Sequence, residues 1–182
     1  MKILILVLLL LPNAAYCKDF RDAEWGISKS ELKNIEKSEL IKEQDDRLIY
    51  SDVFIVYSVG IIYQFFDNKL IWGSYKFADQ YQDKEKYLRE FLDFNAVLTN
   101  KYGEPKKFDE WKNKNSKFKD DTASAIEAGD LVLWRAWETN TSLIKLTIYG
   151  HNNKFNIETY YFSKNYKDKA SKLIQDLQQD KF

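Results

Sequence analysis

Cysteine, histidine, proline and glycine are all scarce in this chain of 182 residues, which has one cysteine, one histidine, two prolines and six glycines. A single thiol has no partner within the chain, so a disulfide framework is excluded. A structural zinc site needs several cysteine or histidine ligands, which the chain lacks. Few prolines and glycines, with an aromatic content of 16%, indicate an ordered globular protein. We therefore expect no metal and no cofactor.

An excess of charge of either sign is also missing. The 28 basic side chains balance the 28 acidic ones. A nucleic-acid-binding domain normally gathers an excess of lysine and arginine on one face, where they neutralise phosphates. We therefore expect no nucleic-acid partner.

The residue patterns of common active sites do not occur either. The one histidine, His151, lies in a Gly-His-Asn-Asn turn, and the one cysteine lies at position 17, so a nucleophilic triad is not indicated. The acidic pairs Asp45-Asp46 and Asp120-Asp121 fit no calcium-binding loop and are typical of solvated turns. No glycine-rich phosphate loop is present. These absences favour a protein without enzymatic activity. They leave open one alternative, a hydrolase of cell-envelope glycans that uses a pair of carboxylates.

Residues 1–17 have the pattern of a secretory signal peptide, with a charged start, an unbroken apolar run from Ile3 to Leu11, and small residues after it. The run is too short for a stable membrane anchor. Cleavage after Cys17 leaves a cysteine-free chain that begins at Lys18 and is periplasmic or secreted. In the alternative, Cys17 becomes the lipidated first residue of an outer-membrane lipoprotein. Tyr16 disfavours that alternative, because lipoprotein signals have a small residue there.

The clearest helix is predicted for residues 83–105, where apolar side chains recur at three- and four-residue steps. Asp83 is the expected N-cap, and Gly103 followed by Pro105 is a typical helix end. A shorter helix is predicted to begin at Ser28, because Ser28 and Glu31 have the spacing of a capping box.

Strands are predicted on both sides of the central helix, with a long loop over residues 106–130 that includes one short helical turn. The predicted strands cover 47–78, 131–138, 143–150 and 155–162, and a last helix is expected at about 165–179. We therefore predict an α+β fold of the order αβββ-αβββ-α, with helices packed on one sheet face. It forms a single domain over residues 18–182, with 18–82 and 83–182 as candidate sub-units.

Three segments resemble a known group of proteins: FRDAEWGISKSELKNIE at the mature start, YQFFDNKLIWGSYKF, and NKYGEP. They are similar to small exported bacterial proteins of unknown function. The W-G-[small apolar]-S-x-x-E opening is similar to the G-M-T/S-x-x-x-V start of BLIP-like and SmpA/BamE-type envelope domains, with Leu32 where those families often have valine. This resemblance implies a helix-on-sheet fold used for binding proteins, without chemistry.

The sheet face away from the helices, called here the second face, is the best candidate for function. Alternation in the strand at 69–77 places Ile71, Tyr75 and Phe77 toward the core and Trp72 toward the second face, where we expect it to be partly exposed. The second face is predicted to carry Leu70, Trp72, Lys76, Trp134, Lys145, Tyr149, Tyr160 and Phe162. The side on which Trp134 and Trp137 lie stays open, because both alternating sets of LVLWRAWE are apolar. Aromatic and cationic side chains on a strand surface are typical of a protein-binding patch. We therefore expect a protein partner to bind six of these residues, namely Trp72, Lys76, Trp134, Lys145, Tyr149 and Tyr160. Cover by a helix, by the long loop or by a second copy is the alternative.

Overall fold

The computed structural model describes residues 18–166, 168 and 169, and the expected leader with Cys17 and most of the expected last helix lie outside them. The described helices are α1 (Lys29–Ile35), α2 (Glu85–Tyr102), α3 (Thr122–Glu127) and the 3-10 helix η1 (Lys164–Tyr166). The described strands are β1 (Glu39–Glu43), β2 (Arg47–Phe54), β3 (Tyr57–Phe66), β4 (Lys69–Phe77), β5 (Lys106–Trp111), β6 (Leu131–Glu138), β7 (Ser142–His151) and β8 (Lys154–Ser163).

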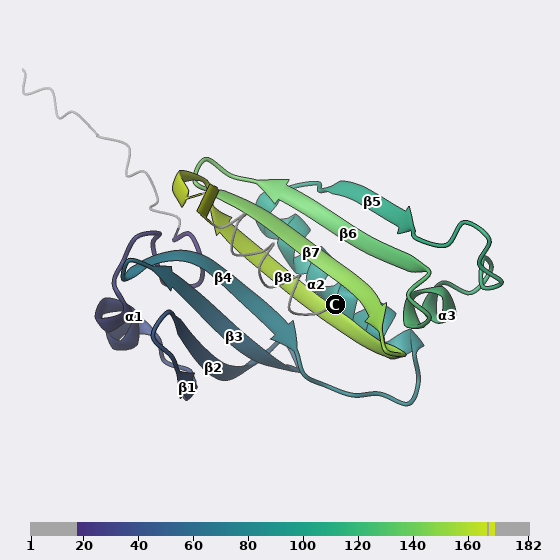
Figure 1. The fold of residues 1–182 in the computed structure, drawn as a ribbon, viewed down its shortest axis with the longest axis horizontal. Coiled ribbons are helices and arrows are strands. Elements are labelled where there is room, and N and C mark those ends of the chain that lie inside the picture. The colour runs from purple at the N-terminus through teal and green to yellow at the C-terminus, as the bar shows by residue number, and fades with distance from the viewer. Residues whose placement is uncertain (1–17, 167, 170–182) are drawn as a thin grey trace, which may run out of the picture.

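All eight strands form one antiparallel sheet with the order β1-β2-β3-β4-β8-β7-β6-β5. It consists of two four-stranded meanders that join where β4 pairs with β8 (Figure 1). The expected α+β class is therefore confirmed. The expected three-stranded units are wrong, because each half has a fourth strand at the outer edge of the sheet.

The two strands that the sequence did not predict are the edge strands β1 and β5. Every residue of β1 is exposed, and so is every residue of β5 except Trp111. An edge strand exposed on both faces lacks the alternation of apolar and polar residues by which a strand is recognised. The predicted loop at 106–130 thus contains β5 and α3, and Asp121 caps α3 by accepting a hydrogen bond from the Ser124 amide at 2.9 Å.

Helix α2 lies behind β7 and β8 and runs roughly along them, on the side away from the viewer in Figure 1. Its extent matches the predicted central helix, and it ends at Gly103, whose φ of 83° favours glycine. Its start differs slightly, since Lys84 occupies the N-cap and Asp83 instead accepts a hydrogen bond from the Glu85 amide at 3.0 Å. Helices α2 and α3 both contact β6, β7 and β8, whereas α1 lies at one end of the first meander. The helices are therefore not stacked as one layer over the sheet.

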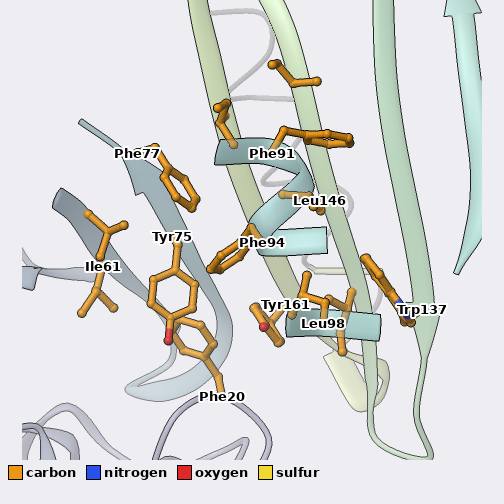
Figure 2. Packing of buried hydrophobic residues seen from close by; sticks show 14 of the residues in the cluster. Phe20, Ile61, Tyr75, Phe77, Phe91, Phe94, Leu98, Trp137, Leu146 and Tyr161 are labelled. Atoms are coloured by element: carbon orange, nitrogen blue, oxygen red, sulfur yellow. The ribbon is translucent and has the colours of Figure 1, made fainter. Parts of the chain in front are cut away.

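The core between α2 and the sheet is rich in aromatic side chains (Figure 2). Phe94 of α2 packs edge-on against Phe77 of β4, with ring centroids 4.9 Å apart, and against Phe54 of β2 at 4.6 Å. Ile144 and Leu146 of β7 are buried in the same cluster. Trp137 is also in this cluster, which decides its side of the sheet.

The segment before α1 closes one end of this core through Phe20. The Phe20 ring contacts the rings of Tyr63 and Tyr75, each at 5.2 Å, and that of Tyr161 at 4.8 Å. Gly73 makes this position possible, because a Cβ atom there would lie 2.1 Å from a carbon of the Phe20 ring. The N-terminal segment is therefore an integral part of the core.

A β-bulge in β4 changes the side of the sheet on which Leu70 lies. Gln64 of β3 pairs with Trp72 and Phe65 pairs with Leu70, so Ile71 is an extra residue without a partner. Leu70 therefore lies on the core side with Phe65, and its predicted place on the second face is wrong. Ile71 is buried, with an exposed fraction of 0%, but it is not part of the core cluster that contains Leu70, Tyr75 and Phe77, so its predicted place in that core is not borne out.

Helix α1 begins as predicted. The Glu31 amide donates to Ser28 Oγ at 3.3 Å, and the Ser28 amide donates to Glu31 Oε2 at 2.7 Å, which together form the capping box. Leu32, one residue further on, is fully buried and fixes the helix against the core.

Replacing Ser28 with alanine should lower the free energy of unfolding by about 0.5–2 kcal/mol, because the cap acceptor is lost. Urea denaturation measures the change. Asn34→Ala, at an exposed position of the same helix, is the matched control, and it should be neutral or slightly stabilising, since alanine is the better helix former. Equal loss in both variants would show that the cap does not stabilise the protein.

Candidate functional site

The six residues that the sequence singled out for binding lie together on the second face. Paired residues of antiparallel strands share a face. Trp72, Ser74 and Lys76 of β4 pair with Phe162, Tyr160 and Glu158 of β8. Through β8, β7 and β6 the same face continues to the remaining members of the set. The six residues are Trp72, Lys76, Trp134, Lys145, Tyr149 and Tyr160.

Trp72 lies within an aromatic stack rather than at the surface. Its ring is stacked with those of Tyr160 at 5.9 Å and Phe162 at 6.2 Å, both on β8. Its exposed fraction is 5%, so the prediction that Trp72 is partly exposed is wrong. Trp72 lies on the predicted side of the sheet despite the bulge. Its exposure was predicted wrongly because alternation along one strand does not reveal the large aromatic side chains on the neighbouring strand.

Glu158 is a buried carboxylate beside this stack, and its bonds suit a structural role. The hydroxyls of Tyr149 and Tyr160 both donate to Glu158, and Lys76 Nζ lies 3.6 Å from it. Burial, and then the negative charge of Glu158, raise the pKa of both tyrosines, which therefore stay neutral and act as donors. A carboxylate with its bonds already filled in this way is poorly placed to act as an acid or base.

The more open part of the second face, called here the Trp134 patch, consists of Phe108, Trp134 and Lys145. The Phe108 ring of β5 is stacked on the Trp134 ring of β6, with centroids 3.7 Å apart and planes 13° from parallel. Lys145 Nζ of β7 lies 4.8 Å from the centroid of the Trp134 ring. Phe108 is 40% exposed, and Trp134 and Lys145 are half-buried. Burial lowers the pKa of Lys145, so an anion placed nearby would favour its charged form.

Phe108 is the residue of this patch that sequence reasoning missed, because it lay in the predicted loop. The sequence offers no clear signal for it. In KKFDEW the alternating sets Lys106, Phe108, Glu110 and Lys107, Asp109, Trp111 each contain one aromatic residue, so neither set is marked as the buried one.

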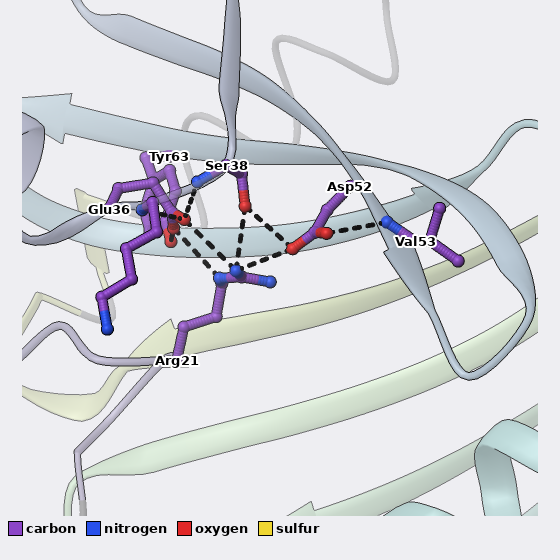
Figure 3. A network of polar contacts seen from close by, with 7 residues as sticks. Arg21, Glu36, Ser38, Asp52, Val53 and Tyr63 are labelled. Carbon is purple, nitrogen blue, oxygen red and sulfur yellow. Dashed lines mark hydrogen bonds and ion pairs between the residues drawn. The ribbon is translucent and has the colours of Figure 1, made fainter.

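A polar network at the opposite end of the molecule centres on Arg21 (Figure 3). Its guanidinium donates to Glu36 at 3.0 Å, to Asp52 at 2.9 Å and to Ser38 Oγ at 3.0 Å. Tyr63 also donates to Glu36, whose side chain is only 4% exposed. Burial opposes ionisation of Glu36, but these hydrogen bonds and the Arg21 charge outweigh it and lower its pKa. The network joins the N-terminal segment to the first meander, which is a structural role.

Glu90 of α2 is a third buried acid, besides Glu158 and Glu36. Its exposed fraction is 1%, and neither carboxylate oxygen has a hydrogen-bond partner in the described part of the chain. Burial, and then the charge of Asp79, raise its pKa to about 8, so it is mostly protonated at neutral pH. A raised pKa is typical of a general acid, but a side chain this buried is not accessible to a glycan.

The remaining candidates for chemistry lie apart from one another. His151 is at the exposed end of β7 beside Asn152, and Asp121 is the cap of α3. Asp46 accepts a hydrogen bond from Gln64 at 2.7 Å. Within residues 18–166, 168 and 169, no cluster of three or more histidine, cysteine, aspartate or glutamate side chains is arranged to hold a metal ion.

The same residues contain no helix with the length and apolar character needed to cross a membrane. No family model, no curated protein and no solved structure matches this chain.

Proposed function

We propose that this chain is an exported, non-enzymatic binding module, periplasmic or secreted, that docks a protein partner on the Trp134 patch. The observation that carries the proposal is the stack of Phe108 on Trp134 with Lys145 above it, on the face away from α2. Aromatic side chains that are already rigidly stacked lose little conformational freedom on binding, and such residues dominate protein interfaces.

The chemistry of the patch indicates what the partner presents. Phe108 offers an exposed ring for an apolar side chain, and the half-buried ammonium of Lys145 favours a carboxylate next to it. We therefore propose a protein surface with an apolar side chain beside an aspartate or glutamate. The leader expected at residues 1–17 directs the search to the cell envelope.

The resemblance to BLIP-like and SmpA/BamE-type domains supports the same proposal. Those domains have a helix-on-sheet design, and here α2 packs across one face of an antiparallel sheet and leaves a second face. We include this kinship in the proposal, together with its implication of binding without catalysis.

The proposal predicts that Phe108→Ala weakens partner binding by about thirtyfold, the equivalent of a 2 kcal/mol hot spot. The purified protein is immobilised, partners are captured from an envelope extract, and the affinity for the captured protein is measured. Folding stability should change little, because Phe108 is 40% exposed on an edge strand.

Leu92→Ala is the matched control, since Leu92 is an apolar side chain of α2 with an exposed fraction of 55%. It should bind like the unaltered chain. Equal affinities for Phe108→Ala and the parent, or a loss caused by Leu92→Ala instead, would place the interface elsewhere on the molecule.

A further inference from the structure

One region of the second face is buried although α2 and α3 contact the sheet from the other side. Its centre is β3, β4 and β8, where Trp72 is 5% exposed and Ser74 is 3% exposed. Large neighbouring rings explain part of the burial of Trp72. Ser74 pairs with Tyr160, whose side chain shields it in part. Ile71 is 0% exposed although it is not part of the core cluster, so a cover over this face is needed to explain its burial.

The chain itself turns back toward this region after β8. It passes through η1, where the Tyr166 hydroxyl lies 3.7 Å from the position that a Cβ atom on Gly26 would take. Asp168 and Lys169 have helical backbone, and Lys169 Nζ lies 3.9 Å from the centroid of the Phe66 ring. Phe66 is the last residue of β3 and alternates with the inward Phe65, so this contact is on the second face.

The sequence that follows has the pattern needed to cover an apolar surface. Residues 170–182 read ASKLIQDLQQDKF. Ala170, Leu173, Ile174 and Leu177 recur at three- and four-residue steps and would form one apolar stripe, with Gln175 and Gln179 on the opposite side. As a helix this length measures about 20 Å, the width of about four strands.

We propose that residues 170–182 dock this apolar stripe on the second face over β3, β4 and β8. The segment offers amide and carboxylate acceptors for Trp72 Nε1, which is buried without a hydrogen-bond partner among the described residues. The Trp134 patch stays uncovered, because Phe108 at its edge is 40% exposed. This inference is separate from the proposed function and holds whether or not a partner binds that patch.

A thiol at position 74 tests the docking directly. In the full chain with Cys17→Ser, Ser74→Cys introduces a thiol of nearly the same size as the native side chain, and its rate of reaction with DTNB reports how well that face is covered. Ser30→Cys, at an exposed position of α1, gives the rate for an uncovered thiol. We expect the thiol at position 74 to react at least about a hundredfold more slowly than the thiol at position 30.

Negative charges placed in the apolar stripe of residues 170–182 should then expose the thiol at position 74. Adding Leu173→Asp and Ile174→Asp should raise the rate at position 74 by about tenfold or more, while Gln175→Asp and Gln179→Asp, which add the same charge to the other side, should leave it unchanged. A thermal melt confirms that the variants stay folded. If the charged variant unfolds, Ile174→Ala gives the same comparison with a smaller rise, about threefold.

Two results would overturn the docking. One is a thiol at position 74 that reacts as fast as the one at position 30 in the otherwise unaltered chain. The other is equal protection in the stripe variants and the glutamine variants, which would mean that another part of the molecule covers Trp72.

Discussion

Replacing Arg21 with methionine should lower the free energy of unfolding by about 3–5 kcal/mol, the usual effect of removing one partner from a buried ion pair. The reason is that Glu36, whose side chain is 4% exposed, would keep its charge without the guanidinium that compensates it. Asp52 and Ser38 would lose a donor in the same step. Chemical denaturation at neutral pH measures the change.

A second substitution separates the loss of charge pairing from the loss of packing. Adding Glu36→Gln to Arg21→Met removes the uncompensated charge and should recover part of the loss. Lys33→Met is the matched control, because Lys33 pairs with Glu43 at 2.7 Å but both side chains are more than 40% exposed, so its effect on stability should be small. If Arg21→Met and Lys33→Met destabilise equally, the network contributes no more than a surface ion pair.

Replacing Glu90 with glutamine should stabilise the protein, and the gain should grow with pH. Folded Glu90 keeps its proton up to a pKa of about 8, whereas in the unfolded chain it ionises near its ordinary value of 4.5. Between these values the folded state binds more protons, so its stability falls as pH rises. Glutamine cannot ionise and avoids this loss.

Urea denaturation of both proteins at several pH values tests this. The two should differ by less than about 1 kcal/mol at pH 5, and by on the order of 4 kcal/mol at pH 9. Glu85→Gln, an exposed position in the first turn of the same helix, is the control and should change stability by a few tenths of a kcal/mol. Parallel pH profiles for Glu90→Gln and the parent would mean that Glu90 is ionised in the folded protein.

The sequence predicted those helices and strands that have one apolar side and one polar side, or a recognisable cap. The central helix has an apolar stripe, and the start of α1 has a capping box, so both were located to within a few residues. The strands β1 and β5 could not be predicted in the same way, because nearly all their side chains are exposed. The side of the sheet on which Leu70 lies could not be predicted either, because nothing in the local sequence marks the unpaired Ile71 as a bulge.

Most residues of the candidate site were predicted from the sequence. Which of them are exposed to solvent and which are buried was not predicted. Alternation along β4 placed Trp72 on the second face, and the sheet register agrees. The side of Trp134 stayed open from the sequence, and the pairing of β6 with β7 and β8 puts it on the same face. Exposure depends on the neighbouring strands, however, and these come from distant parts of the sequence. Trp72 is buried in part by the ring of Phe162 on β8. Trp134 lies beside the edge strand β5, where Phe108 remains exposed.

The join between β4 and β8 is the one place in the sheet where strands far apart in the sequence pair, as Trp72 with Phe162. Every other pairing closes a short connection, apart from β5 with β6, which spans α3. Short loops close with little entropy loss, whereas joining distant strands costs more and slows folding. Each meander should therefore assemble early on its own. The meeting of β4 with β8 is then the slow step of folding, and until it occurs each half exposes a long unpaired strand edge that is able to pair with another copy of the chain.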